Sequence, residues 1–241
     1  MENNFIPLDL LKEKAKSFNI ELNNEALSRF DTYGRLLVEW NEKINLTAIT
    51  EPEEIVIKHF VDSLTIFSYV DIPEGSKVID VGTGAGFPGL VMLIARPDID
   101  LTLMDSTNKK LNVIRDILGR IGLEANVVHM RAEQAGQDKS FREQYDFVTA
   151  RAVANLRDLS EYCLPFVKVG GSFISMKSAR TNEEIDEAKA AVKILGGKIE
   201  HIDSFDLFNS GERTIINVKK ISSTPTKYPR PSAKMAKFPL K

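Results

Sequence analysis

The sequence predicts an α/β fold in which a Rossmann-like, mostly parallel sheet follows a helical amino-terminal region. Three observations lead to this prediction. Apolar residues recur at helical spacing before residue 70, and short apolar strands alternate with helical stretches from Val78 onward. A glycine-rich segment also follows the first of these strands. With 241 residues, 43% of them hydrophobic, the chain can bury one sizeable core.

Residues 1 to 72 are expected to form a helical extension with three helices. Apolar residues between Leu8 and Phe18 share one face of the first helix. The second helix starts at Asn23 or Asn24, either of which can cap its first turn, and continues through Trp40.

The third helix is expected to begin at Thr50-Glu51-Pro52-Glu53 and to run to about Tyr69. Thr50 and Glu53 have the spacing of a capping box, and Pro52 suits the first turn. One polar strip on this helix consists of His59, Asp62 and Ser63. We favour a role for this strip in bracing the helix against the following domain over a role in catalysis.

Residues 73 to 221 are expected to form the sheet domain. Five strands separated by helices predict a parallel sheet with right-handed crossovers; they are Val78–Val81, Leu101–Met104, Asn126–His129, Phe147–Thr149 and Ser172–Ser175. The intervening helices lie near residues 88 to 96, 107 to 121, 153 to 164 and 182 to 195. Two final strands, Lys198–Leu207 and Thr214–Val218, have no helix between them and predict an antiparallel hairpin at the sheet edge.

The glycine loop after the first strand indicates a cofactor site. Its residues, Asp80-Val81-Gly82-Thr83-Gly84-Ala85-Gly86-Phe87-Pro88-Gly89, let the backbone approach a ligand closely before a helix begins. Gly84, Gly86 and Gly89 also fit the dinucleotide fingerprint, which keeps a nicotinamide or flavin cofactor open. The carboxylate of Asp80 would repel a pyrophosphate but suits the cationic amino acid end of S-adenosylmethionine. The spacing of Gly82, Gly84 and Gly86 is the form found in methyltransferases.

Two acidic residues extend this site. Asp105 ends the second strand, where a carboxylate can accept hydrogen bonds from both ribose hydroxyls, although it would serve NAD equally well. Glu133 follows the third strand, and together with Ala132 it could address the edge of an adenine. The alternative for each carboxylate is a helix cap or a surface charge.

The acceptor is suggested by what the sequence lacks. The Asx-Pro-Pro-aromatic turn used to methylate base amines is replaced by Thr149-Ala150-Arg151-Ala152. The only cysteine, Cys163, is expected in the core and not as a nucleophile. With one cysteine and three scattered histidines, no metal site is expected. An acceptor with a free lone pair, such as guanine N7, needs only alignment with the methyl group.

Arg151, at the end of the fourth strand, is the main candidate to meet the acceptor, at guanine O6 or a phosphate. The alternative is an ion pair with Glu133 or Asp146 that braces the cofactor site. Lys177, after the fifth strand, is a second basic candidate, and an ordinary surface lysine is the alternative.

The carboxyl-terminal tail, residues 222 to 241, differs in charge from the rest of the chain. From Lys219 onward there are seven of the 32 basic residues and none of the 34 acidic ones. Four prolines disfavour helix and predict an extended segment that suits a phosphate backbone, with a solvated or disordered tail as the alternative. The chain lacks a signal peptide pattern and a long apolar run, so we expect a cytoplasmic protein with no membrane contact.

Several motifs together resemble one family, ribosomal RNA small subunit methyltransferase G, also called glucose-inhibited division protein B. The motifs span nearly the whole chain: Trp40–Thr50, Lys58–Leu64, Asp80–Gly89, Asp105–Lys110, Ala150–Ala154 and Tyr228–Arg230. Two positions depart mildly from the family pattern, Thr107 and Lys110, and neither touches the inferred chemistry.

The resemblance implies a class I S-adenosylmethionine-dependent methyltransferase that modifies N7 of one guanine in the 530 loop of 16S ribosomal RNA. It implies that Gly82, Phe87, the Ala132-Glu133 pair and Arg151 bind the cofactor. The partner would be 16S rRNA or the small ribosomal subunit, and we expect a monomer. The rival hypotheses are a methyltransferase for a small molecule or protein and a non-catalytic regulator that binds S-adenosylmethionine.

Overall fold

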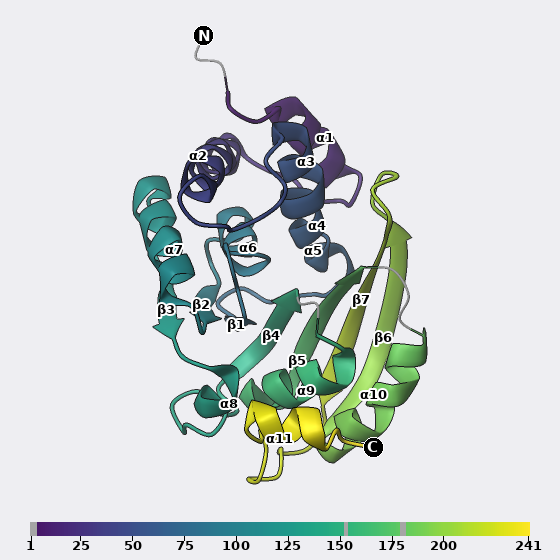
Figure 1. The fold of residues 1–241 in the computed structure, drawn as a ribbon. Coiled ribbons are helices and arrows are strands. Elements are labelled where there is room, and N and C mark those ends of the chain that lie inside the picture. The colour runs from purple at the N-terminus through teal and green to yellow at the C-terminus, as the bar shows by residue number, and fades with distance from the viewer. Residues whose placement is uncertain (1–3, 152–153, 179–181) are drawn as a thin grey trace.

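The computed structural model describes residues 4–151, 154–178 and 182–241, and its centre is one seven-stranded sheet (Figure 1). The strands run in the order β3-β2-β1-β4-β5-β7-β6. Their bounds are β1 Lys77–Val81, β2 Asp100–Asp105, β3 Asn126–His129, β4 Tyr145–Arg151, β5 Val167–Ser178, β6 Gly197–Asp206 and β7 Glu212–Lys220. The predicted sheet of seven strands, with the terminal hairpin at one edge, is therefore confirmed.

The first five strands are parallel to one another, and β7 pairs antiparallel with both β5 and β6. The terminal hairpin therefore pairs with the parallel strands through its second strand, β7, and its first strand, β6, forms the edge of the sheet. As a result, the start of β7 lies beside the end of β5, where Arg213 is paired with Ser178. The hairpin contributes side chains to the edge at which the parallel strands end.

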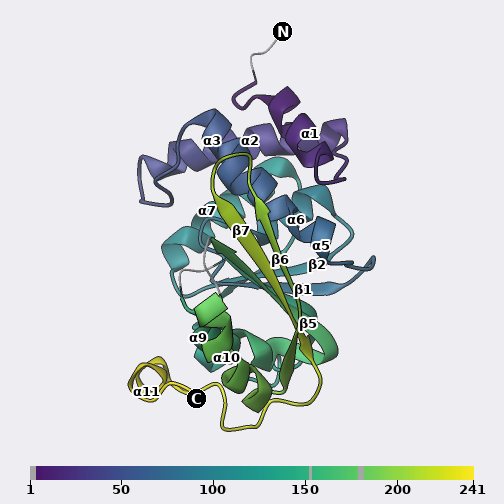
Figure 2. The same cartoon turned by 90° about the vertical axis from the view of Figure 1, so that its right-hand side faces the viewer.

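The helical extension covers one end of the molecule (Figure 2). It contains α1 (Leu8–Lys16), α2 (Asn24–Asn41), α3 (Pro52–Ile55), a π-helical turn (Val56–Val61), α4 (Asp62–Leu64) and α5 (Ile66–Tyr69). The side chain of Asn23 accepts a hydrogen bond from the backbone N–H of Ala26, as predicted for a cap. The predicted capping box is wrong, because the third helical segment starts after Glu51 with no side-chain cap.

The remaining helices lie on both faces of the sheet. They are α6 (Gly89–Ala95), α7 (Asn108–Ile121), α8 (Ala132–Ala135), α9 (Leu156–Cys163), α10 (Asn182–Ile194) and α11 (Ser232–Lys237), with a 3-10 turn at Leu164–Phe166. Gly122 adopts a left-handed conformation, φ 65°, and ends α7.

Alternate residues of the strands enter two apolar cores. Val78 and Leu103 pack with α6, α7 and the helical extension, whereas Ile79 and Met104 pack with α9 and α10. The extension therefore shares a core with the sheet domain. Cys163 is fully buried in the second core, as predicted, and burial raises the pKa of its thiol. No helix in the described ranges is long and apolar enough to cross a membrane.

The prediction that the tail is extended is wrong for part of its length. Residues 232–237 form the short helix α11, which begins directly after Pro231, and the side chains of Tyr228, Met235 and Leu240 are buried. Proline disfavours the interior of a helix but not the position before its first turn, so four prolines did not exclude a helix here. The tail is folded against the sheet domain, on the side of α8 and α9 (Figure 1).

Candidate functional site

The glycine loop joins β1 to α6 and is held in shape by the neighbouring strand. Gly82, Gly84 and Gly86 have φ values of 74°, 60° and 107°, which side-chain-bearing residues rarely adopt. The N–H of Gly82 donates to the carbonyl of Met104 at 2.9 Å, and the N–H of Gly84 donates to the Asp105 carboxylate at 3.0 Å. The loop conformation is therefore fixed by the end of β2.

Asp80 lies behind this loop and not on the wall of a cavity. Its side chain is fully buried, accepting hydrogen bonds from the N–H of Gly89 at 3.0 Å and from the Thr149 hydroxyl at 3.2 Å. Burial raises the pKa of Asp80 to about 6, an effect partly offset by these hydrogen bonds. Asp80 thereby ties β1 to the start of α6 and to β4. Its role at the amino group of the cofactor stays a prediction.

The helical extension supports the far side of the loop. The Tyr33 hydroxyl of α2 donates to the carbonyl of Ala85 at 2.7 Å. The ring of Phe87 stacks on Tyr33, with centroids 5.5 Å apart, and on His59, with centroids 4.4 Å apart. A Cβ atom on Gly86 would lie 2.7 Å from the Tyr33 hydroxyl oxygen. Gly86 is thus required for close packing against the extension.

A cavity of about 300 Å³ opens at the carboxyl ends of β1, β2 and β3. Gly82 and Asp105 form one part of its wall, and Ala132 and Glu133 of α8 form another. Its other lining residues come from β1 and β2, the segment after β3, α9 and the tail: Val81, Met104, Ser106, Met130, Arg131, Ala154, Leu159, Tyr162 and Ser232. The cavity faces the side of the sheet that α8, α9 and α11 cover.

The cavity brings together four of the nine residues predicted to bind the cofactor. Asp80, Gly84, Gly86, Phe87 and Arg151 are not among its lining residues. The reason is that their side chains or backbone turns pack against the extension or within the sheet. The sequence analysis missed Ser232, because no local pattern in the tail indicates that it returns to the end of β3.

The lining suits an adenosine group in both size and chemistry. A volume near 300 Å³ is at the lower end of the range for small-molecule sites. The side chains of Met104, Met130 and Leu159 supply apolar surface for a flat base, and the carboxylates of Asp105 and Glu133 supply acceptors for hydroxyl or amino groups. The Asp105 carboxylate also accepts the N–H of Thr107 at 2.8 Å, just before α7 begins. Its role at the ribose stays a prediction.

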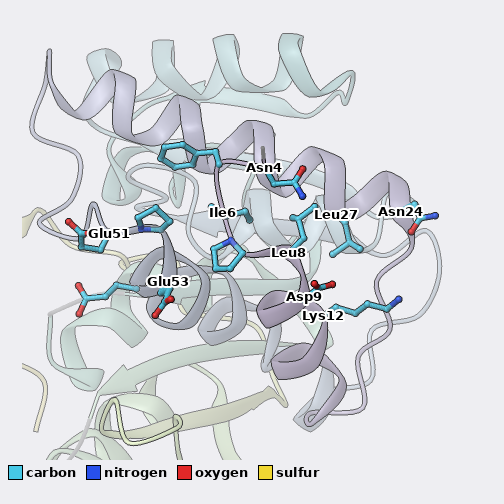
Figure 3. A pocket seen from close by; sticks show the side chains of 13 residues that line it. Asn4, Ile6, Leu8, Asp9, Lys12, Asn24, Leu27, Glu51 and Glu53 are labelled. Atoms are coloured by element: carbon cyan, nitrogen blue, oxygen red, sulfur yellow. The ribbon is translucent and has the colours of Figure 1, made fainter. Parts of the chain in front are cut away.

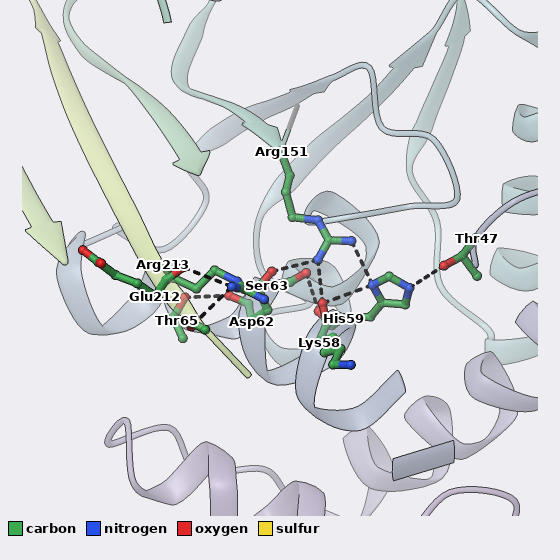
Figure 4. A network of polar contacts seen from close by, with 10 residues as sticks. Thr47, Lys58, His59, Asp62, Ser63, Thr65, Arg151, Glu212 and Arg213 are labelled. Carbon is green, nitrogen blue, oxygen red and sulfur yellow. Dashed lines mark hydrogen bonds and ion pairs between the residues drawn. The ribbon is translucent and has the colours of Figure 1, made fainter. Parts of the chain in front are cut away.

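Arg151, at the end of β4, is held by the π-helical turn of the extension (Figure 4). Its Nη1 atom donates to Asp62 Oδ2 at 3.0 Å and to the carbonyl of Lys58 at 3.2 Å, and Nη2 donates to His59 Nδ1 at 3.1 Å. The guanidinium lies 4.7 Å from the centre of the Phe87 ring. In the described part of the chain, these contacts use three of its five N–H groups, leaving two for a ligand.

Both ring nitrogens of His59 have polar neighbours. Nδ1 lies 3.1 Å from the Arg151 guanidinium and 3.1 Å from the carbonyl oxygen of Lys58, and Nε2 lies 2.9 Å from the Thr47 hydroxyl oxygen. Burial and the adjacent Arg151 charge lower the pKa of His59 to about 3. His59 is therefore neutral at physiological pH.

The bracing prediction for the polar strip is confirmed for His59 and Asp62, which both contact Arg151 of β4. The hydroxyl of Ser63 instead donates to the carbonyl of His59 within the extension. The Asp62 carboxylate receives Arg151 and also Nε of Arg213, at 3.1 Å. The sequence alternatives for Arg151, an ion pair with Glu133 or Asp146, are wrong. Glu133 instead contacts the tail, and Asp146 pairs with Lys168.

A second cavity, of about 560 Å³, lies beside this network. It is lined by residues from the extension, β4, β5, α10 and the terminal hairpin: Ile49, Lys58, His59, Asp62, Arg151, Met176, Lys177, Ser178, Glu184, Phe205, Arg213, Thr214 and Ile215. Two guanidinium groups share the single Asp62 carboxylate, so the network carries a surplus positive charge. We call this the cationic cavity.

Lys177 also lines the cationic cavity, but the surface alternative is wrong. Its side chain is only 7% exposed, pairs with Glu184 at 2.6 Å, and donates to the carbonyl of Ala154. Glu184 also accepts the N–H of Leu156. Lys177 therefore links β5 to α9 and α10. Ala152 and Val153 of the family motif lie outside the described residues.

The largest cavity lies away from this edge of the sheet (Figure 3). It measures about 1020 Å³ and is formed by the amino-terminal segment and the starts of α2 and α3. Its charged lining is mainly acidic, with Asp9, Glu51, Glu53 and Glu54 against one lysine, Lys12. Such a surface does not suit a nucleic acid. Among the described residues, no group of three or more His, Cys, Asp or Glu side chains is placed to hold a metal ion.

Solved structures with low sequence identity share the fold of this chain. A variant of the 16S rRNA (adenine(1408)-N(1))-methyltransferase from Catenulisporales acidiphilia matches with a TM-score of 0.53 at 12% identity, covering 63% of this chain and 88% of that one. The precorrin-6y C5,15-methyltransferase from Geobacter metallireducens matches with a TM-score of 0.52 at 13% identity, covering 75% and 95%. Acceptors this different show that the fold alone does not identify the acceptor.

Sequence comparison is more specific. A protein from Clostridium novyi named ribosomal RNA small subunit methyltransferase G is 45% identical over 242 residues and covers 100% of both chains. A relative of the same name from Acetivibrio thermocellus is 48% identical, covering 96% of both chains. The model of the family described as rRNA small subunit methyltransferase G matches residues 26–215. This chain therefore belongs to the rRNA small subunit methyltransferase G family.

Proposed function

We propose that this protein transfers the methyl group of S-adenosylmethionine to N7 of a guanine in the 530 loop of 16S ribosomal RNA. One observation carries the proposal. In a member of this family, the cavity with Gly82, Asp105 and Glu133 and the cationic cavity around Arg151 lie at the same edge of the sheet, where ligands bind in open α/β folds. The first cavity suits the cofactor, and the second suits an anionic acceptor.

In this proposal the chain acts mainly by positioning. S-adenosylmethionine supplies a sulfonium methyl group, whose bond to sulfur breaks as the bond to N7 forms, with the electron pair remaining on sulfur. Guanine N7 already has a lone pair, so the enzyme needs no general base. His59 agrees with this, because a ring with a pKa of about 3 is too weak a base to take up a proton near neutral pH.

The free N–H groups of Arg151 would bind guanine O6 or a phosphate. A proton donated to N7 would occupy the lone pair that has to react, so O6 is the suitable base atom for a guanidinium. Arg213, which shares Asp62 with Arg151, adds positive charge beside the acceptor. Lys177 would act through its contacts with Glu184 and Ala154, by holding the strand and helices that frame the cavity.

RNA contact beyond the target base would involve exposed cations. At the end of β7 this is Lys219, which is partly exposed, and in the tail these are Lys227, Lys234, Lys237 and Lys241. Lys220 and Arg230 are engaged inside the protein, so the basic tail has fewer free charges than its sequence indicates. A ribosomal RNA substrate would make this a cytoplasmic enzyme, and we propose that it acts as a monomer.

The test uses labelled S-adenosylmethionine with two substrates, naked 16S rRNA and small subunits from a strain that lacks this methylation. Methylated positions are then mapped by borohydride reduction and aniline cleavage, which detect N7-methylguanine. We expect label at one guanine of the 530 loop in one of the two substrates. Label at another base atom, or on protein, would favour a different acceptor.

Absence of label in either RNA substrate would refute the proposal and leave two alternatives. A small-molecule acceptor would still consume S-adenosylmethionine when cell extract is added. A non-catalytic regulator would bind the cofactor without transferring its methyl group to any acceptor.

A further inference from the structure

The carboxyl-terminal tail reaches the wall of the cofactor cavity. The hydroxyl of Ser232 donates to Glu133 Oε1 at 2.6 Å, although the two residues are 99 positions apart in the sequence. Both residues line the same cavity. A carboxylate has about four lone-pair sites, and this bond uses one of them. The rest of the Glu133 carboxylate can still serve a ligand.

The segment before Ser232 is fixed to the sheet domain by buried contacts. Arg230 binds Glu161 of α9 with its backbone N–H at 2.9 Å, with Nε at 2.7 Å and with Nη2 at 2.6 Å. The side chains of these two residues are 13% and 2% exposed. The carbonyl of Pro229 accepts Nε2 of Gln137 at 3.0 Å.

Other contacts connect the tail to the segment that follows α8, the helix that contains Glu133. Arg142 donates to the carbonyls of Tyr228 at 2.7 Å and Thr224 at 2.6 Å, and also to Gly136 at the end of α8. A Cβ on Gly136 would lie 2.8 Å from the Pro229 ring. The position of Ser232 relative to Glu133 is therefore set by several independent contacts.

We infer that Ser232 is a positioning residue that orients Glu133 toward the 6-amino group of the cofactor's adenine, so that the tail forms part of the cofactor site. The inference rests on the proposed cofactor site. A short hydrogen bond to a carboxylate is charge-assisted and restricts the Glu133 rotamer. The free Glu133 oxygen then accepts a hydrogen bond from the adenine amino group. This makes the tail a wall of the cofactor cavity as well as a carrier of RNA-facing lysines.

The test measures binding of two product analogues by calorimetry: S-adenosylhomocysteine and S-inosylhomocysteine, which has an oxygen in place of the 6-amino group. We expect the wild-type protein to prefer the adenosyl form by about 100-fold, because an oxygen would face the Glu133 carboxylate. Ser232→Ala should weaken adenosyl binding about 10-fold and inosyl binding hardly at all. Ser232→Thr, which keeps the hydroxyl, should restore most of the preference.

Two further variants complete the design. Thr226→Ala removes an exposed tail hydroxyl for which no contact is found in the described residues and should leave both affinities unchanged. Glu133→Gln should lower the preference for the adenosyl form at least as much as Ser232→Ala, and combining the two changes should add little. Thermal unfolding of each variant shows whether the fold is intact.

Three outcomes would overturn the inference. If Ser232→Ala keeps the full preference, Ser232 does not act through Glu133. If Glu133→Gln keeps it, Glu133 does not read the adenine, although the proposed methyl transfer can still hold. If the wild-type protein binds neither analogue and methylates no RNA, the proposed function fails together with the inference.

Discussion

The ion pair between Arg230 and Glu161 should hold the tail in place, and removing Arg230 tests this. Glu161 lies on α9 with a side chain that is 2% exposed, and three hydrogen bonds from Arg230 reach its carboxylate. In Arg230→Ala only the backbone N–H remains. The carboxylate then stays buried with most of its compensation lost. The substitution also removes the hydrogen bond that the guanidinium donates to the carbonyl of Phe238 at 2.7 Å.

The expected cost follows from this geometry. Removing one partner of a buried ion pair costs about 3–5 kcal/mol, and the remaining N–H and the partial exposure of Arg230 favour the lower end, about 3 kcal/mol. For a domain of this size, about 3 kcal/mol lowers the melting temperature by roughly 6–12 °C. The tail can instead detach before the rest of the domain unfolds. Ser232 then loses its hydrogen bond to Glu133, and the lost ion-pair energy is observed as weaker cofactor binding.

The assay combines thermal and urea unfolding with calorimetric binding of S-adenosylhomocysteine. Lys237→Met is the matched control, since Lys237 is an exposed cation of the same tail without an ion pair in the described residues. A double variant, Arg230→Met with Glu161→Leu, should be more stable than Arg230→Met alone, because it leaves no buried charge. If Arg230→Ala changes neither stability nor cofactor affinity, or if the double variant costs the sum of both single changes, the reasoning is refuted.

Three further predictions concern the loop and the acceptor side. His59 stays neutral in the folded protein, with a pKa of about 3, whereas in the unfolded chain it gains a proton below pH 6.5, so the free energy of unfolding should fall on acidification. Between pH 6.5 and 5, His59→Gln should lose about 2 kcal/mol less of this free energy than the wild-type protein, as measured by urea titrations. Gly86→Ala, with φ at 107° and its Cβ 2.7 Å from the Tyr33 hydroxyl, should cost about 1–3 kcal/mol, whereas Gly119→Ala, in open space within α7, should not destabilise. Arg151→Lys should lower kcat/KM for RNA about 100-fold and the melting temperature by a few degrees, because an ammonium cannot replace the guanidinium fork that also binds Asp62 and His59. Near-wild-type kinetics would exclude a role for the fork in the reaction.

Much of the fold was predictable because it depends on local patterns. Short apolar strands alternating with helical stretches identified the parallel sheet, and the missing helix between the last two strands identified the hairpin. The glycine loop was predictable for the same reason, since only glycine readily adopts φ values such as the 107° of Gly86. The capping box failed because Thr50 and Glu53 have the right spacing, but the chain enters the helix one residue later.

Some features of the candidate site could likewise be predicted from the sequence, and others could not. Gly82, Asp105 and Glu133 each follow a strand, so their meeting at one edge follows from the parallel topology. The partner of Arg151 did not follow. Asp62 is 89 positions away, and several carboxylates were equally plausible by sequence.

The sheet, the loop and the family follow from the amino-acid sequence, through the alternation of strands and helices, the glycine spacing and motifs that span the chain. The surroundings of Arg151 and the position of the tail depend on tertiary packing. Its basic, proline-rich composition predicted an extended RNA-binding segment, yet Arg230 is paired with Glu161 and Ser232 with Glu133. Composition records the charge of a side chain but not its partner. Partners here lie 69 and 99 residues apart, and only the packed chain brings them together.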